Sequence, residues 1–241
     1  MKILTAFGML LLSSWVSPKI TREARGQLKP LNTFSHAAHK TLRNSEQYLE
    51  AVQNRFTFLE NYAPPQEKYL QQPESFNADT NSAAKTTWMS AHDREVLYWL
   101  NVARLNPSGF FNRFLLKAAQ ANPSNSYLSS LMKTMYSMKP VPALIPDKSL
   151  YDAAMCHARS SGISGYVGHT RNNTQCKKIY TGECCSYGAD SPLDVVIQLL
   201  VDEGVTSLGH RILCLGEGFT IAGIASAPHT RFRTNTVIDF R

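Results

Sequence analysis

Residues 179–187 read Ile-Tyr-Thr-Gly-Glu-Cys-Cys-Ser-Tyr, and this stretch decides the expected fold. A polar, glycine-containing loop over residues 164–178 precedes this stretch. The residues of 179–187 themselves predict a strand. Successive side chains of a strand point to opposite faces of the sheet, so Cys184 and Cys185 should not meet the same partner. Glu183 belongs to the same strand, where it either faces solvent or is buried beside other polar groups.

The segments on either side of this strand differ in their patterns. Apolar residues at helical spacing, with capping residues and prolines between them, predict four preceding helices: from Ser90 to Asn106-Pro107, Ser108–Ala121, Asn125–Met138, and from Asp147 through Ala158. After the strand, the pattern predicts a helix opening at Ser191-Pro192 and two strands, Phe219–Ser226 and Phe232–Phe240, with a solvated His229 at their turn. Helices followed by short antiparallel strands indicate an α+β layered domain.

Composition excludes some classes of protein. The chain has 241 residues, of which 43% are hydrophobic, so a packed core is expected and wholesale disorder is excluded. Its net charge is +7, yet no basic run exceeds a dipeptide, which does not favour a nucleic-acid groove. A mild affinity for anionic surfaces, with at most peripheral membrane contact, is what this charge supports.

The N-terminus predicts export. Lys2 is followed by a short apolar run, which is typical of a signal peptide over residues 1–26 with a cleavage site that the sequence leaves open. We then expect a helical segment over 27–62, a flexible linker over 63–87 and the main domain over 88–241. The protein should therefore be secreted, or periplasmic if its source is bacterial.

Four acid and imidazole positions form the candidate site: His169, Glu183, Glu203 and His210. Two neutral imidazoles and two carboxylates can hold a divalent metal or share protons if they converge. We name His169 and His210 as candidate ligands of a cation such as Zn²⁺. The alternative is that both histidines are ordinary hydrogen-bonded or loop residues.

The order of these motifs resembles the CAP superfamily, which comprises cysteine-rich secretory proteins, antigen five and pathogenesis-related proteins. The resemblance covers residues 90–241 and rests on these motifs: Leu100-Asn101-Val102-Ala103-Arg104, Gly168-His169-Thr170, Gly182-Glu183 and Gly209-His210-Arg211. It implies an α-β-α sandwich with the four site residues lining a central cleft. The chain departs from the family at Leu200-Val201, which replaces a Trp-Tyr pair, so Asp202 competes with Glu203 as the fourth residue. Cys184 replaces the family's Asn.

The five cysteines all lie between residues 156 and 214. In an exported protein they predict one or two disulfides with a leftover thiol. We favour Cys214 paired with Cys184 or Cys185. Cys214 follows a helical segment that begins near His210, and the chain after that segment could return beside the strand.

Function follows as two hypotheses. The first is a secreted CAP-domain protein that binds a small ligand, a lipid or a divalent cation without catalysis. The second is a metal-dependent hydrolase of peptides or cell-envelope components. No nucleophile elbow of the Gly-x-Ser-x-Gly type occurs, and a thiol nucleophile at Cys184 or Cys185 is a minor alternative.

Overall fold

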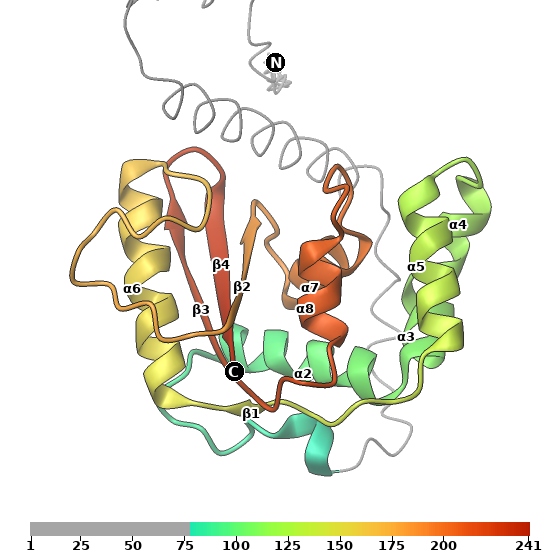
Figure 1. Cartoon of the computed structure of the whole chain (residues 1–241), viewed down its shortest axis with the longest axis horizontal. Helices are drawn as coiled ribbons and strands as arrows, with labels where there is room; N and C mark the ends of the chain where they lie inside the picture. Colours follow the sequence, from blue (N-terminus) through green and yellow to red (C-terminus); the bar gives the residue numbers. More distant parts are fainter. Residues whose placement is uncertain (1–77) are drawn as a thin grey trace, which may run out of the picture. The chain divides into compact units, whose positions relative to one another are not determined.

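The computed structural model describes residues 78–241 (Figure 1). Its elements are, in chain order, η3 (Ala78–Asn81), α2 (Ala91–Leu105), α3 (Pro107–Phe114), α4 (Leu116–Ala121), α5 (Ser126–Ser137), β1 (Ile145–Pro146), α6 (Lys148–Ser164), β2 (Gly182–Tyr187), α7 (Pro192–Val201), α8 (Gly209–Leu215), β3 (Ile221–His229) and β4 (Arg233–Phe240). The mixture of helices and a small sheet is α+β. The expected signal peptide, the expected helical segment over 27–62 and residues 63–77 of the expected linker lie outside the described residues.

The helices begin where side chains cap them. Ser90, Asp147 and Ser191 accept hydrogen bonds from backbone N–H groups in the first turns of α2, α6 and α7. Such caps satisfy donors that a helix start otherwise leaves unpaired. The predicted helix over Ser108–Ala121 is instead two helices, because the backbone at Leu115 leaves the helical conformation between α3 and α4.

The sheet has four strands in the order β1-β3-β4-β2. The β3–β4 pair is antiparallel, as the sequence predicts for this hairpin, and the β2–β4 pair is antiparallel as well. The short strand β1 adds a parallel pair with β3, which makes the sheet mixed. This strand order makes β2 an edge strand. Its register places Glu183 opposite Asp239 and Cys184 opposite Ile238, so the two carboxyl groups of Glu183 and Asp239 lie on one face.

Helices cover both faces of this sheet (Figure 1). Helix α6 packs on one face, where Cys185 and Tyr187 meet Ala154 and Ala158. The other face, which includes Cys184, packs against α2, α7 and α8. The predicted separation of Cys184 and Cys185 onto opposite faces is therefore confirmed.

Glycine permits the close approach of α6 to the sheet. A Cβ on Gly223 of β3 would lie 2.1 Å from the backbone of Leu150, and a Cβ on Gly162 of α6 would lie 2.0 Å from the carbonyl oxygen of Pro228. Neither backbone neighbour can move aside cheaply, so a larger residue at either position would push helix and hairpin apart.

Residues 78–87, which the sequence assigned to the end of the linker, pack on the domain. Ser82 Oγ donates to the carbonyl of Leu144 at 2.7 Å and accepts from Asn101 Nδ2 at 3.2 Å, while Ala83 is buried. The low apolar content of this segment hid a role that depends on hydrogen bonds. The ordered domain therefore begins before Trp88.

Candidate functional site

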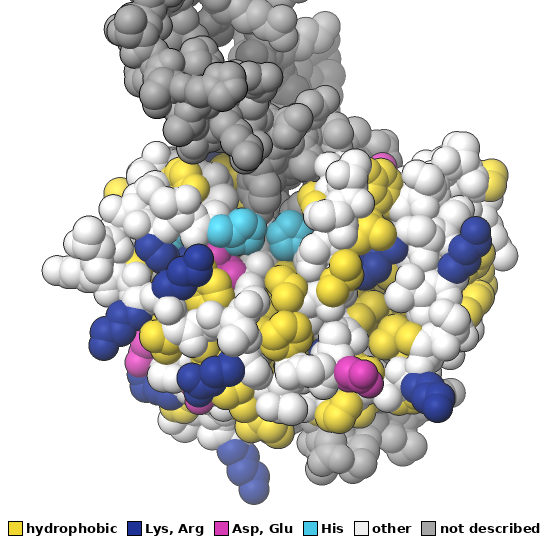
Figure 2. Space-filling model, in the orientation of Figure 1, with side chains coloured by type: hydrophobic (Ala, Val, Ile, Leu, Met, Phe, Trp, Pro, Cys, Tyr) yellow, Lys and Arg dark blue, Asp and Glu magenta, His cyan; other side chains and the backbone are white. Residues whose placement is uncertain are grey.

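Two histidines meet at the edge strand β2. His169 comes from the loop that follows α6, and His210 lies in the first turn of α8. Their ring centroids are 6.0 Å apart and their planes are inclined by 30°. Two neighbouring histidine side chains are visible on the face shown in Figure 2, with acidic and basic groups close by. The structure thus brings together the two imidazoles that the sequence singled out.

Glu183 orients the first of these rings. Its Oε1 accepts from His169 Nδ1 at 2.9 Å and from the Tyr180 hydroxyl at 3.3 Å, and its Oε2 forms an ion pair with Arg171. Burial alone would raise the pKa of Glu183, but the hydrogen bond from His169 and the charge of Arg171 outweigh it and lower that pKa. Glu183 is therefore a carboxylate at neutral pH, and His169 must carry its proton on Nδ1.

Asp202, and not Glu203, orients the second ring. Asp202 Oδ1 accepts from His210 Nδ1 at 2.8 Å, and its Oδ2 accepts from the His210 backbone N–H at 3.0 Å. Glu203 turns away and accepts from Asn125 Nδ2 at 3.1 Å, and burial raises its pKa. Asp202 ends α7 in a left-handed conformation with φ of 55°, which reorients the chain at that residue and explains the one-residue difference.

Asp239 on β4 is a site residue that the sequence analysis missed. It lies opposite Glu183 in the register, is fully buried and hydrogen-bonds with the Glu183 carboxylate. Burial and the negative charge of Glu183 raise the pKa of Asp239 to about 9, against the opposing charge of Arg171. A lone acid in the apolar run Val237-Ile238-Asp239-Phe240 was the signal that could have revealed it.

The two arginines next to the histidines have different roles. Arg171 contacts both buried acids, with Nη2 3.4 Å from each carboxyl oxygen of Asp239. Arg211 is buried, donates to backbone carbonyls of residues 127, 200 and 201, and donates to Ser130 Oγ at 2.7 Å. Arg171 therefore holds the acids together, whereas Arg211 braces the end of α7 against α5.

The disulfide differs from the pairing that we favoured. Cys156 of α6 bonds to Cys176 in the following loop, and Cys184, Cys185 and Cys214 form no disulfide. Cys184 Sγ of β2 donates to the backbone carbonyl of His210 in α8 at 3.7 Å, so the expected proximity of α8 and β2 holds even though no disulfide joins them. Burial raises the pKa of both Cys184 and Cys185 well above the ordinary value, which argues against a thiolate nucleophile at either position.

A second group of potential ligands lies behind the histidine pair. One donor atom from each of His157, Glu183 and Cys185 falls within 4.8 Å of the others, and all three residues are buried. Such a group could hold a metal ion.

His229, expected at a solvated turn, is instead buried, and its Nε2 forms a hydrogen bond with the carbonyl oxygen of Tyr166 at 3.0 Å.

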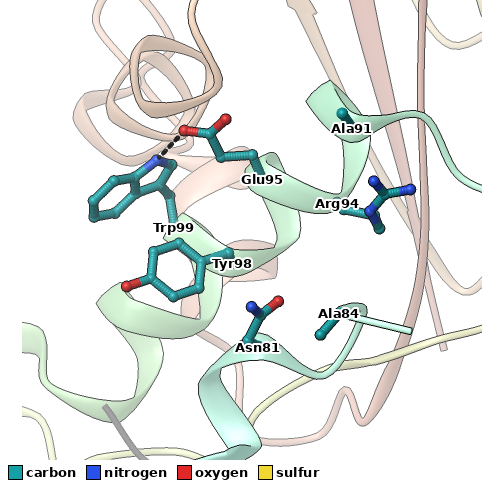
Figure 3. A pocket seen from close by; sticks show the side chains of 7 residues that line it. All are labelled: Asn81, Ala84, Ala91, Arg94, Glu95, Tyr98 and Trp99. Carbon is teal, nitrogen blue, oxygen red and sulfur yellow. Dashed lines mark hydrogen bonds between the residues drawn. The ribbon is translucent and has the colours of Figure 1, made fainter. Parts of the chain in front are cut away.

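A separate pocket of about 430 Å³ lies along α2 and shares no residue with the histidine pair (Figure 3). Figure 3 shows the hydrogen bond that Trp99 Nε1 donates to the carboxylate of Glu95. Arg94 on the same helix donates to the backbone carbonyls of Thr86 and Met89. These polar groups are engaged by the protein itself, so they do not converge on a ligand. The histidine pair remains the better candidate site.

No helix among residues 78–241 is both long and apolar enough to cross a membrane. Comparison with known proteins adds no relative: no protein-family model matches the chain, and no curated protein is a significant match to it.

Proposed function

We propose that the chain is an exported CAP-type binding protein whose cleft at His169 and His210 binds a divalent cation such as Zn²⁺. One observation carries this proposal: each imidazole donates its Nδ1–H to a buried carboxylate, Glu183 for His169 and Asp202 for His210. In metal sites the same second hydrogen bond fixes the tautomer of a ligating histidine and raises its basicity.

The coordinating atoms would be the two Nε2 nitrogens, because both Nδ1 atoms carry protons that point at carboxylates. Two nitrogen ligands leave further positions for water or an exogenous group, which is the pattern of an open and weak site. Glu183 and Asp202 act here as positioning residues. The cation, or a small ligand or lipid anchored on it, would be the molecule that this protein binds.

Export is supported by the disulfide between Cys156 and Cys176, since such bonds persist in oxidising compartments. The CAP assignment is supported by the order of the sequence motifs and by helices on both faces of a small sheet. Within the resemblance, Asp202 replaces Glu203 as the fourth cleft residue.

A binding role is favoured over metal-dependent hydrolysis. A hydrolase of that kind needs a carboxylate that can take a proton from water, and Glu183 is the acid nearest the exposed histidine. Both of its oxygens are engaged by His169, Tyr180 and Arg171, and the hydrogen bond from His169 and the charge of Arg171 lower its pKa. Glu183 is therefore a poor base.

Titration calorimetry with Zn²⁺ on the purified protein tests this proposal. We expect a saturable binding component that is lost in the His169→Ala/His210→Ala double variant. Asp202→Asn should weaken binding by about tenfold to a hundredfold, since it removes the anionic partner of His210. Glu203→Gln is the matched control, and its affinity should equal that of the wild type. Full-strength binding in the double variant would refute the proposal.

A further inference from the structure

His157, Glu183 and Cys185 form a buried cluster on the face of the sheet that α6 covers. Glu183 and Cys185 are two residues apart on β2, so both point to this face, and His157 reaches them from α6. One donor atom of each lies within 4.8 Å of the other two. The residues are 1%, 6% and 0% exposed, respectively, which separates the cluster from the more open His169 beside it.

The imidazole of His157 has one nitrogen that the protein uses and one that it does not. Nε2 lies 2.9 Å from the carbonyl oxygen of Gly168, which can only accept, so Nε2 carries the proton. Nδ1 then presents a lone pair, and it is buried without a hydrogen-bond partner. Burial also lowers the pKa of His157, which keeps the ring neutral.

A buried acceptor without a partner destabilises the folded protein unless something binds it. A ligating histidine shows the same division, with one N–H held by a backbone carbonyl and the other nitrogen directed at the metal. The neighbouring thiol does not supply the missing hydrogen bond to Nδ1, because Cys185 Sγ instead lies 3.9 Å from the carbonyl of Gly168 and 3.7 Å from His169 Nδ1.

We propose that His157, Glu183 and Cys185 form a buried metal site for a thiophilic divalent cation such as Zn²⁺. Nitrogen, carboxylate oxygen and thiolate sulfur are all ligands of Zn²⁺, and three protein ligands leave one position for water. Mg²⁺ and Ca²⁺ prefer sites made only of oxygen atoms, so this donor set selects against them. This site and the histidine pair share Glu183, which also accepts from His169 Nδ1, but the nitrogen and sulfur ligands of the two cations are different residues.

Binding changes the charge balance of the cluster in a defined way. The cation replaces the thiol proton of Cys185, which forms a sulfur–metal bond and releases one proton to solvent. The positive charge of Arg171, which contacts Glu183, repels a cation bound there. Arg171 Nη2 also lies 3.4 Å from both carboxyl oxygens of Asp239. Arg171 therefore keeps a carboxyl partner when Glu183 turns to the metal.

Co²⁺ is the appropriate probe, because a cobalt–thiolate bond gives a charge-transfer absorption band in the near ultraviolet. Titration of the purified, disulfide-intact protein should produce this band, and an excess of Zn²⁺ should abolish it. Cys185→Ser should remove the band, and His157→Asn should weaken Co²⁺ binding by more than about tenfold. Cys184→Ser is the matched control, because Cys184 points to the opposite face of the sheet, and it should keep the band.

Three results would overturn the proposal: no band in the wild type at saturating Co²⁺, a band that persists in Cys185→Ser, or a band that disappears in a folded Cys184→Ser. Cadmium NMR of the wild type decides the question without a variant, because one thiolate ligand shifts the resonance strongly downfield. His210→Ala separates the two sites, since it should abolish binding at the histidine pair and leave the cobalt–thiolate band intact.

Discussion

Replacing Asp239 with asparagine should make the protein less sensitive to pH. In the folded protein the pKa of Asp239 is about 9, because burial and the charge of Glu183 raise it. The unfolded chain ionises this group near pH ~3.9. Between these values the folded state holds a proton that the unfolded state has lost, so the free energy of unfolding falls as pH rises.

The size of this effect follows from one proton. The free energy of unfolding falls by about 1.4 kcal/mol per pH unit, which amounts to roughly 4 kcal/mol between about pH 5 and about pH 8. Glu183, whose pKa is lowered, acts with the opposite sign and only in more acidic solution. Asparagine keeps a donor toward Glu183 and a carbonyl oxygen toward Arg171, yet it cannot ionise. Asp239→Asn should therefore equal the wild type near pH ~5 and exceed its stability by about 2 to 4 kcal/mol near pH ~8.

Urea unfolding at several pH values, in the presence of a chelator, measures this difference. Asp190→Asn is the control, since Asp190 is exposed and paired with Arg233 on the surface, and it should retain the wild-type slope. Parallel pH profiles for the wild type and Asp239→Asn would refute the reasoning. A variant that is less stable than the wild type near pH ~8 would do the same.

Three further predictions concern stability and are measured by urea unfolding. Cys156→Ser should cost about 3 kcal/mol, because it opens the loop closed by Cys176, and the same loss should follow reduction of the wild type. Arg104→Met should cost at least about 3 kcal/mol, because the buried guanidinium donates to four backbone carbonyls; an unchanged midpoint would contradict this. A chain that begins at Thr86 should be about 2 kcal/mol less stable than one that begins at residue 78, since it lacks the hydrogen bonds of Ser82, and equal stabilities would support the domain start at residue 88 that the sequence predicts.

Local features of the sequence determined most of the helices and strands. Ser90, Asp147 and Ser191 begin helices because their side chains can reach unpaired N–H groups a turn ahead, which is an interaction between near neighbours in the chain. Alternation along a strand likewise assigned Cys184 and Cys185 to opposite faces without knowledge of what covers them. The two-residue strand β1 carries no such pattern and was missed.

The site was only partly readable from the sequence. His169, Glu183 and His210 were recognisable by residue type and by neighbouring glycines. The choice between Asp202 and Glu203 depended on one backbone conformation at the end of α7, which composition does not encode. Asp239 joined Glu183 only because strand register set two residues more than fifty positions apart against each other.

The cysteine pairing and the burial of His229 show the same limit. Any of the five cysteines could have bonded by sequence, and it was the path of the loop after α6 that brought Cys176 to Cys156. His229, expected at a solvated turn, is buried because helix α6 and the β3–β4 hairpin pack together. The sequence by itself determined which chemical groups were present and which short segments would form helices or strands. Tertiary structure alone decided which groups share a desolvated space, because burial and charge pairing depend on neighbours that are distant in the chain.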